Sequence, residues 1–351
     1  MKIALLNDKL DAGGAEKVLV NMANMLHSNG IDVSVVLFLG ASVLDSLINP
    51  AIPIHYLHRK GRFDVKAMFA LKRVVKDFEI VHVHSRYNLR YYFVAKTIAG
   101  IHKPKVVFHE HIPILSVSYF TKLCLQKSDA YIAVMKSMTQ WAKDTLQLKP
   151  AKVFYLPNII NAPIDSIARQ AVGHKIIMVG NIWHFKNQLF AVDLINALPQ
   201  DYTLDIYGSK NDKDYYGKLM DKIIESGLQN RVKIVEGISD IYAVLGNYNF
   251  AIHTSPHETG PLVLLEYMHA GLPFLTFKTG DVIANIEEKM PEVIVDSFDI
   301  NSWKNAIEQF MMDANRRMML RIKMNSIIEE KYAEKNYYQQ LNQIYSIINL
   351  N

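Results

Sequence analysis

Residues 250–277 read FAIHTSPHETGPLVLLEYMHAGLPFLTF and predict a strand, a loop, a short helix and a second strand. FAIHTS and PFLTF are short apolar runs, which are typical of buried strands. Pro261 suits the first position of a helix, because its missing N–H would have no intrahelical partner there. Gly271 suits the helix end, and Pro273 prevents continuation. We therefore predict a helix over about 261–270, with its N-terminus next to the carboxyl end of the first strand.

The same alternation of strand and helix runs along most of the chain. Short apolar, β-branched segments are separated by intervals that show helical periodicity or have room for a helix. This order is typical of parallel sheets covered by helices on both faces. The segments that predict strands are 2–7, 32–38, 79–85, 105–111, 130–135, 152–158, 175–181, 202–208, 231–237, 250–255, 273–277 and 292–296.

One interruption divides this pattern into two halves. The stretch IINAPIDSIARQAVGHK, residues 159–175, holds a proline and a glycine but no clear strand. We predict an α/β protein with two Rossmann-like, doubly wound domains facing across a cleft. Their bounds are 1–160 and 175–330, joined by a linker over 161–174. Two such domains suit a two-substrate reaction, because ligands bind at the carboxyl ends of the strands in these sheets.

The C-terminal part of the chain differs from the rest. After Ser302 there is little strand signal, and residues 329–350, EEKYAEKNYYQQLNQIYSIINL, predict one amphipathic helix. Its Tyr and Ile side chains recur at helical spacing, which indicates packing more than a ligand site. We assign 331–351 to a C-terminal helix.

Composition narrows the class of protein. Of the 351 residues, 50% are hydrophobic and 21% charged, as in globular proteins. The single cysteine, Cys124, excludes an internal disulfide and lies in an apolar segment, so we predict a buried structural thiol. No apolar run reaches the roughly 18–20 residues that span a bilayer, and no secretory signal is evident. We therefore expect a cytoplasmic protein.

The net charge of +5 is unevenly distributed. Two basic stretches that also carry aromatic residues, 58–76 and 86–96, lie in the first half of the chain. Such a face can dock on an anionic membrane, which would make the protein peripheral on the inner face of the plasma membrane. The alternative is an ordinary solvated helix surface. We expect no nucleic acid partner, because the chain has no recognised binding motif and no dense basic stripe.

Two carboxylates flank the predicted helix of 261–270. Glu258 lies on the loop before it, and Glu266 lies about one and a half turns inside it. The free N–H groups and the dipole of a helix N-terminus attract an anion such as a diphosphate. Glu266 could then accept hydrogen bonds from the two hydroxyls of a ribose, and Glu258 from a sugar. Both could instead be ordinary surface acids, although Glu266 has few polar neighbours.

The spacing of Glu258 and Glu266, E-x(7)-E, resembles the donor-site motif of retaining GT-B glycosyltransferases, most closely glycosyltransferase family four (glycosyl transferases group 1). The resemblance covers most of the chain in the family's order. It includes the opening strand, Gly-Gly loop and helix, the end of the first domain and the opening of the second. The segments that carry it are KIALLNDKLDAGGAEKVLVNMANML, SDAYIAVMKSM, VFYLPNIIN and IIMVGNIWHFKNQ.

This resemblance implies that the first domain binds the acceptor, that the second binds the nucleotide-sugar donor, and that the C-terminal helix of 331–351 returns to pack on the first domain. It also implies roles for individual residues. Lys186 would neutralise the diphosphate of the donor, His109 would sit by the transferred sugar, and both would act in catalysis with Glu258. The family usually has arginine where this sequence has Asn181, so one positive charge is missing. The donor would be bound by Gly14, Asn181, Lys186, Glu258, Thr259, Gly260, Pro261, Leu262, Val263 and Glu266, and the acceptor by Gly13, His84 and His111.

We expect no metal and no cofactor. The trio His109, Glu110 and His111 could bind a metal in principle, but the sequence shows no clear further ligand. There is no G-x-G-x-x-G, which argues against a dinucleotide oxidoreductase. His82 and His84 share one face of a strand end, and they could line the acceptor pocket or be core histidines.

The family implies a retaining, metal-independent transferase that moves a sugar from a nucleotide-diphosphate sugar to a glycan or lipid-linked acceptor. Capsule, exopolysaccharide or lipopolysaccharide assembly are the expected settings. Two alternatives remain open: another GT-B enzyme, such as a nucleotide-sugar epimerase or a phosphorylase, and a non-enzymatic sugar-nucleotide-binding protein. Intact Glu258, Glu266 and Lys186 argue against the last of these.

Overall fold

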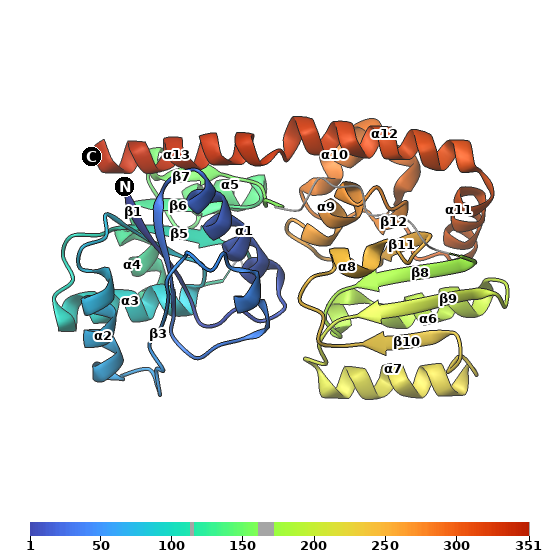
Figure 1. The fold of residues 1–351 in the computed structure, drawn as a ribbon, viewed down its shortest axis with the longest axis horizontal. Helices are drawn as coiled ribbons and strands as arrows, with labels where there is room; N and C mark the ends of the chain where they lie inside the picture. The colour runs from blue at the N-terminus through green and yellow to red at the C-terminus, as the bar shows by residue number, and fades with distance from the viewer. Residues whose placement is uncertain (113–115, 161–171, 351) are drawn as a thin grey trace. The chain divides into compact units, whose positions relative to one another are not determined.

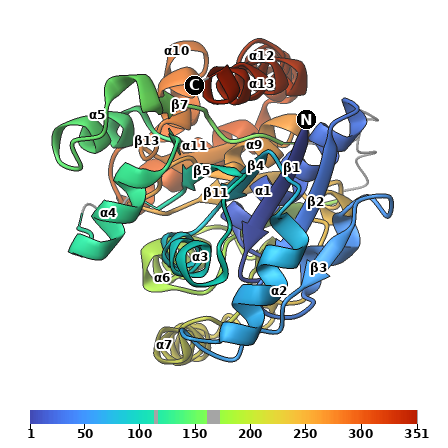
Figure 2. The same cartoon turned by 90° about the vertical axis from the view of Figure 1, so that its left-hand side faces the viewer.

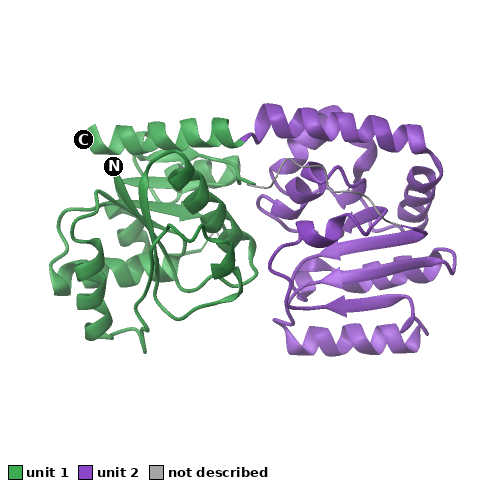
Figure 3. Ribbon diagram, viewed as in Figure 1, with its two compact units in different colours: residues 1–161, 334–351 green, residues 162–333 purple. Residues whose placement is uncertain are grey.

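The computed structural model describes residues 1–112, 116–160 and 172–350. Two compact units make up the chain, Met1–Asn161 with Glu334–Asn351, and Ala162–Ala333 (Figure 3). Most of the predicted linker, 161–174, lies outside the described residues. No helix in the described part of the chain is long and apolar enough to cross a membrane.

The first unit is built on a parallel sheet with the order β3-β2-β1-β4-β5-β6-β7 (Figures 1 and 2). Its strands are β1 (Lys2–Asn7), β2 (Asp32–Leu37), β3 (Ile54–Tyr56), β4 (Ile80–Val83), β5 (Lys105–Glu110), β6 (Ala130–Ala133) and β7 (Val153–Tyr155). Its helices are α1 (Gly14–Ser28), η1 (Val43–Leu47), α2 (Val65–Val75), α3 (Arg86–Ala99), α4 (Tyr119–Lys127), α5 (Lys136–Asp144), η2 (Pro150–Lys152) and α13 (Glu334–Leu350).

The second unit has a parallel sheet with the order β10-β9-β8-β11-β12-β13. Its strands are β8 (His174–Val179), β9 (Tyr202–Tyr207), β10 (Val232–Val235), β11 (Phe250–His253), β12 (Phe274–Phe277) and β13 (Ile294–Val295). Its helices are η3 (His184–Lys186), α6 (Gln188–Ala197), α7 (Lys213–Glu225), α8 (Tyr242–Leu245), α9 (Leu262–His269), α10 (Val282–Lys289), η4 (Pro291–Val293), α11 (Ile300–Met312) and α12 (Ala314–Lys331).

Both sheets show the doubly wound order, in which the direction of winding reverses beside the first strand. The predicted α/β class is confirmed, and every predicted strand is present within a few residues of its expected bounds. The sequence analysis missed β3, which is only three residues long, half-buried and paired with β2 at the sheet edge. Such a strand is too short to show a clear alternation of polar and apolar residues.

The predicted C-terminal helix is present as α13, but the prediction that it is continuous from residue 329 is wrong. The structure has two helices, α12 and α13, separated at Tyr332 and Ala333. Tyr332 is buried, and its hydroxyl accepts a hydrogen bond from Asn285 of α10, which holds the end of α12. Beyond the break, α13 belongs to the first unit and packs against α1.

Cys124 on α4 is buried in the core of the first unit, so the prediction of a structural thiol is confirmed. Burial raises the pKa of this thiol to about 11, which keeps it protonated at neutral pH.

Candidate active site

The switch point of the second sheet carries the principal charged residues of the predicted donor site. It lies between β8 and β11, which are neighbours in the sheet but distant in the sequence. Lys186 follows β8 on η3, and Glu258 lies on the loop after β11. A crevice at this position is where open α/β sheets bind ligands.

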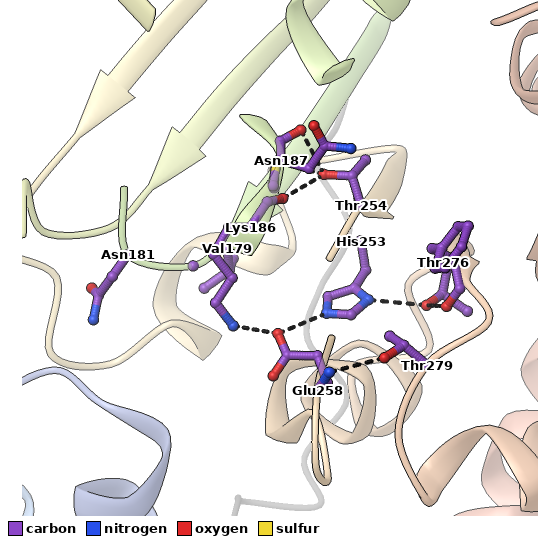
Figure 4. A network of polar contacts seen from close by, with 12 residues as sticks. Val179, Asn181, Lys186, Asn187, His253, Thr254, Glu258, Thr276 and Thr279 are labelled. Atoms are coloured by element: carbon purple, nitrogen blue, oxygen red, sulfur yellow. Dashed lines mark hydrogen bonds and ion pairs between the residues drawn. The ribbon is translucent and has the colours of Figure 1, made fainter. Parts of the chain in front are cut away.

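Lys186 and Glu258 form a direct ion pair between Nζ and Oε1 (Figure 4). The same Oε1 lies 3.5 Å from Nε2 of the buried His253, which is long for a hydrogen bond but close enough for electrostatic attraction. The Nδ1 of His253 lies 3.0 Å from the hydroxyl of Thr276. On the loop itself, the Glu258 amide donates to the Thr279 hydroxyl at 2.9 Å. The sequence analysis did not identify His253, Thr276 or Thr279.

Burial alone would raise the pKa of Glu258, but His253 and the charge of Lys186 outweigh it and lower that pKa to about 2. Glu258 is therefore a carboxylate at neutral pH. The pKa of His253 is lowered, because burial outweighs the attraction of Glu258. The local arrangement is a buried anion held by one cation and by neutral polar groups.

Hydrogen bonds to the backbone of η3 hold Lys186 in position. The hydroxyl of Thr254, just after β11, donates to the carbonyl of Lys186 at 2.8 Å and to that of Asn187 at 3.2 Å. Asn187 has φ +55°, a left-handed conformation that asparagine tolerates better than most residues. The short turn η3 is thus tied to the strand that leads to Glu258.

The loop between Glu258 and α9 packs against the turn after β12. The carbonyl of Thr259 accepts a hydrogen bond from the Asp281 amide at 2.8 Å. Gly280, with φ +80°, allows this approach, because a Cβ there would lie only 2.7 Å from Cδ of Pro261. The predicted donor residues Thr259, Gly260 and Pro261 therefore sit in a backbone fixed by a second loop.

The helix α9 begins at Leu262, so Pro261 is its N-cap and not its first helical residue. Gly271 follows the helix in a left-handed conformation, as expected of a helix stop. The amides of Leu262 and Val263 lie in the first turn, where N–H groups have no intrahelical partner. This end of the helix directly follows the loop of Glu258.

Glu266 is 5% exposed on α9, which excludes the ordinary surface acid considered above. Tyr242 of α8 lies near it: burial and then the charge of Glu266 raise the pKa of this tyrosine. The Tyr242 hydroxyl is buried and has no hydrogen-bond partner among the described residues. A ligand bound at Glu266 would find a second polar group here, which the sequence analysis missed.

Asn181, which stands where the family usually has arginine, lies apart from the ion pair (Figure 4). Its side-chain oxygen accepts a hydrogen bond from the Ser209 amide at 3.0 Å and so links the loops after β8 and β9. At this position the chain therefore has a hydrogen bond between two loops and no positive charge.

In the first unit, four histidines meet on one face of β4 and β5. The register pairs Val83 with Phe108, so His84 lies beside His109 just past the end of β4. The His84 Nδ1 is 3.0 Å from Nε2 of His111, and the rings of His109 and His111 stack at 4.3 Å. His82 completes the group, with its ring 4.8 Å from that of His84.

Glu110 is directed elsewhere, because its carboxylate accepts a hydrogen bond from Nε of Arg86 at 2.6 Å. The trio of His109, Glu110 and His111, considered from the sequence as possible metal ligands, therefore does not converge on one point. Burial lowers the pKa of all four histidines, to about 3 for His82 and His111 and well below the usual value for His84 and His109. All four rings are neutral at pH 7.

Gly13 and Gly14 stand where the loop after β1 enters α1, with Gly13 as the N-cap and Gly14 as the first helical residue. The carboxylate of Glu16 folds back over this turn, so that a Cβ at Gly13 would collide with it. Burial raises the pKa of Glu16. An anion at this helix end would have to displace Glu16, a residue that the sequence analysis did not single out.

Two doubly wound parallel domains are the architecture of the GT-B class of glycosyltransferases. Solved structures of this class align along the whole chain. The Anabaena HepE structure with UDP and glucose has a TM-score of 0.82 at 18% identity, over 99% of each chain. Sucrose-phosphate synthase from Thermosynechococcus elongatus has a TM-score of 0.76 at 16% identity, over 98% of each chain.

Two family models match consecutive parts of the chain, Glycosyltransferase Family 4 over residues 12–162 and Glycosyl transferases group 1 over residues 166–326. This chain therefore belongs to glycosyltransferase family 4, and the resemblance seen in the sequence is confirmed.

Two curated relatives have names that state a role. The capsular polysaccharide biosynthesis glycosyltransferase CapH of Staphylococcus aureus is 22% identical over 250 residues, 64% of this chain and just under two thirds of CapH, at 66%. The UDP-Gal:alpha-D-GlcNAc-diphosphoundecaprenol alpha-1,3-galactosyltransferase of Escherichia coli is 22% identical over 308 residues, 76% of this chain and 75% of that protein.

Proposed function

We propose that this glycosyltransferase transfers a sugar, with retention of configuration and without a metal, from a nucleoside-diphosphate sugar to a hydroxyl of a glycan or lipid-linked acceptor. The supporting observation is the Lys186–Glu258 ion pair at the switch point, directly before the N-terminus of α9. Bacterial surface polysaccharide synthesis is the proposed setting, because CapH is named for capsular polysaccharide biosynthesis and the name of the E. coli relative gives a sugar linked to diphosphoundecaprenol as its acceptor.

The ion pair suggests how a donor would bind. Without a ligand, Glu258 neutralises Lys186. A diphosphate would offer Lys186 and the amides of Leu262 and Val263 a stronger anion. Glu258 would then be released to accept hydrogen bonds from the sugar hydroxyls, while Glu266 accepts them from the ribose. Donor binding thus exchanges one salt bridge for a set of contacts that orient the sugar.

Leaving-group stabilisation would supply most of the rate enhancement. We propose front-face attack, in which the acceptor hydroxyl approaches on the side from which the diphosphate leaves. The new bond joins the acceptor oxygen to the anomeric carbon, and the acceptor's proton passes to a diphosphate oxygen. Lys186 and the end of α9 stabilise the charge that develops on the diphosphate. His109 would contact the transferred sugar, and Gly13, His84 and His111 the acceptor.

A lipid-linked acceptor would require contact with a membrane, and the first unit has a suitable surface around the start of α2. Phe63 is 79% exposed, and Val65 and Phe69 are also exposed, beside the exposed basic residues Arg62 and Lys66. Arg59 and Arg86, from the same basic stretches, do not contribute, because they are engaged with Asp8 and Glu110. We propose that this surface docks on an anionic bilayer.

Vesicle sedimentation tests the membrane surface. Wild type should sediment with vesicles that contain anionic lipid and much less with neutral vesicles. Phe63→Ser should lower the bound fraction several-fold, whereas Ile224→Ser, which removes an exposed apolar side chain in the second unit, should not. Equal loss in both variants would contradict the proposed surface.

The proposed activity is tested by the release of nucleoside diphosphate from a panel of nucleotide sugars, with and without chelator. Slow hydrolysis of one donor that survives chelator and is abolished by Glu266→Ala would support a metal-independent transferase. Conversion of a donor without any acceptor would favour an epimerase, and release of a sugar phosphate would favour a phosphorylase. Binding of nucleoside diphosphate without turnover of any donor and acceptor pair would favour a non-enzymatic binding protein.

A further inference from the structure

The histidine cluster of the first unit contains buried ring nitrogens that have no hydrogen-bond partner among the described residues. They are Nε2 of His82, Nε2 of His84, and both nitrogens of His109. His82 and His109 are completely buried, and His84 is 4% exposed. Buried polar side chains normally have a partner, so four such atoms in one place indicate that something else binds them.

We propose that His82, His84 and His109 bind one transition-metal ion, with Zn²⁺ as the best fit. Each histidine offers one ligand atom, and the three atoms all lie within 4.8 Å of one another. Their rings are 4.8 to 5.3 Å apart between centroids. Three histidines from two adjacent strands thus surround a common point.

The chemistry of these ligands selects the metal. Neutral imidazole nitrogens suit Zn²⁺, Co²⁺ and Ni²⁺, whereas Mg²⁺ and Ca²⁺ prefer oxygen. Bond lengths of about 2.0–2.1 Å require ligand nitrogens about 3.3 Å apart in a tetrahedral site, so small ring rotations would complete it. Burial already keeps the rings deprotonated at neutral pH, as metal binding requires.

For His82 and His84, the other ring nitrogen has a contact of the kind that metal-binding histidines usually show. The Nδ1 of His82 lies 2.7 Å from the hydroxyl of Tyr345, and the Nδ1 of His84 lies 3.0 Å from Nε2 of His111. If each Nδ1 carries the proton and donates it, the Nε2 lone pairs are left for the metal. Such outer contacts fix the tautomer and the orientation of a metal ligand.

His111 lies at the edge of this group and is only half-buried. Its ring stacks on His109 at 4.3 Å and on His84 at 5.2 Å. The fourth coordination position could therefore be filled by His111 after a ring rotation, or by water. Either arrangement gives the four-coordinate geometry that zinc adopts in proteins.

A metal at this site would have two consequences. It would strengthen the link between β4 and α13, because Tyr345 is the contact between the two. It would also occupy His84 and His109, so that Zn²⁺ would inhibit a transfer reaction that itself needs no metal. The second consequence rests on the function proposed above, whereas metal binding does not.

Binding is tested on the full chain after treatment with chelator and its removal. Titration calorimetry with Zn²⁺ should give one site per chain, and Co²⁺ should produce the visible absorption of a tetrahedral nitrogen-ligated ion. His82→Gln should weaken binding at least tenfold. The matched control is His102→Gln, which changes an exposed histidine that follows α3 and should bind as wild type does.

Tyr345→Phe keeps all three ligands and removes the outer contact of His82. We expect it to weaken Zn²⁺ binding by about tenfold or more, in the range typical of such contacts. Thermal unfolding of each variant without metal shows whether it is folded. Zn²⁺ should raise the melting temperature of wild type and of His102→Gln, but not that of His82→Gln.

No saturable binding of either ion, or binding that is unchanged in His82→Gln, would overturn the proposal and indicate that water satisfies these nitrogens. The proposed inhibition has a separate readout, the ratio of activity with and without Zn²⁺ in wild type and in His82→Gln. If no donor is turned over at all, the proposed function fails, and the binding result still stands.

Discussion

The donor constellation of the second unit lies between β8 and β11, where the winding reverses, whereas the histidine cluster of the first unit lies one strand further along a sheet of the same winding order, on β4 and β5. The former is charged, and Lys186 and Glu258 satisfy one another. The latter is neutral, and four of its ring nitrogens have no partner in the described chain. One topology therefore supports two opposite electrostatic arrangements.

This difference indicates what each place can bind. A site that already holds a salt bridge binds a ligand by exchange, so the ligand must bring its own charge and take over one partner. In the histidine cluster, the ring nitrogens of His82, His84 and His109 that have no partner in the described chain can bind a ligand without losing an internal contact. The first arrangement suits a diphosphate, and the second suits a metal ion or a polar, uncharged group.

The largest expected effect follows from Glu258→Ala. This change removes the partner of Lys186 and the proposed contact to the sugar, so we expect turnover to fall by about 10²–10³-fold, as for other groups that act in the transition state. The measurement is initial-rate release of nucleoside diphosphate at saturating donor. Near-normal turnover would show that the ion pair is structural only.

Glu287→Ala is the matched control for this change. Glu287 also forms a lysine salt bridge in the second unit, with Lys278, but both side chains are about half-exposed. We expect turnover within about twofold of wild type, because exposed ion pairs contribute little. A similar loss in both variants would show that the assay responds to lost stability and not to lost chemistry.

Lys186→Ala should be the next largest effect. Loss of the lysine that pairs with Glu258 leaves a buried carboxylate near the proposed diphosphate position, and we expect turnover to fall by about 10²-fold with weaker donor binding. Lys186→Arg keeps the charge and should recover part of the loss. If Lys186→Ala changed only the thermal stability, the proposed role of this lysine in leaving-group stabilisation would be wrong.

The fold could be predicted from the sequence almost completely, because buried parallel strands are continuous apolar runs that alternate with amphipathic helices. The failures were local. The edge strand β3 is too short for a periodic pattern, and the break between α12 and α13 depends on a tertiary contact, the hydrogen bond from Asn285 to Tyr332. Contacts between distant residues leave no local signal.

The candidate site was less predictable. Glu258, Glu266 and Lys186 stood out through spacing and resemblance, but the supporting Thr254, Thr279 and Gly280 did not, because they act through backbone contacts between loops. The meeting of all four histidines depends on β4 and β5 being neighbours in register. The two histidine pairs were visible in the sequence, and adjacent parallel strands would have brought them together.

Acid should affect the first unit of the metal-free protein before the second. Burial lowers the pKa of the four clustered histidines, so their contribution is complete above the unfolded pKa of about 6.5 and is lost as the pH falls toward about 3. Glu258 has a lowered pKa of about 2, so its contribution is lost only between about 4.5 and 2. That shift corresponds to on the order of 3 kcal/mol.

Other groups modify this comparison but do not reverse it. Glu110 opposes the histidines, because its pKa is raised to about 7 and its protonation stabilises the fold as the pH falls. In the described part of the second unit, burial lowers the pKa of two histidines, His253, which is buried, and His269, which is half-buried. Urea unfolding of variants that keep only Trp141 or only Trp303 reports each unit. A drop in midpoint between pH 7 and 5 that is equal for both would refute the prediction.

The smallest effect tests how the charged constellation is held in place. Thr254→Val preserves the shape of the side chain and removes the hydroxyl that donates to the carbonyls of Lys186 and Asn187. We expect the free energy of unfolding to fall by about 1 kcal/mol, the usual effect of losing a buried hydrogen bond. Turnover should decrease by less than tenfold. The loss should appear mainly in the KM for the donor, because Lys186 remains present but less well positioned. Thr254→Val leaves the charge of Lys186 in place, so its effect on turnover should be smaller than that of Lys186→Ala. An equally large loss of turnover would mean that η3 depends on Thr254 for its fold.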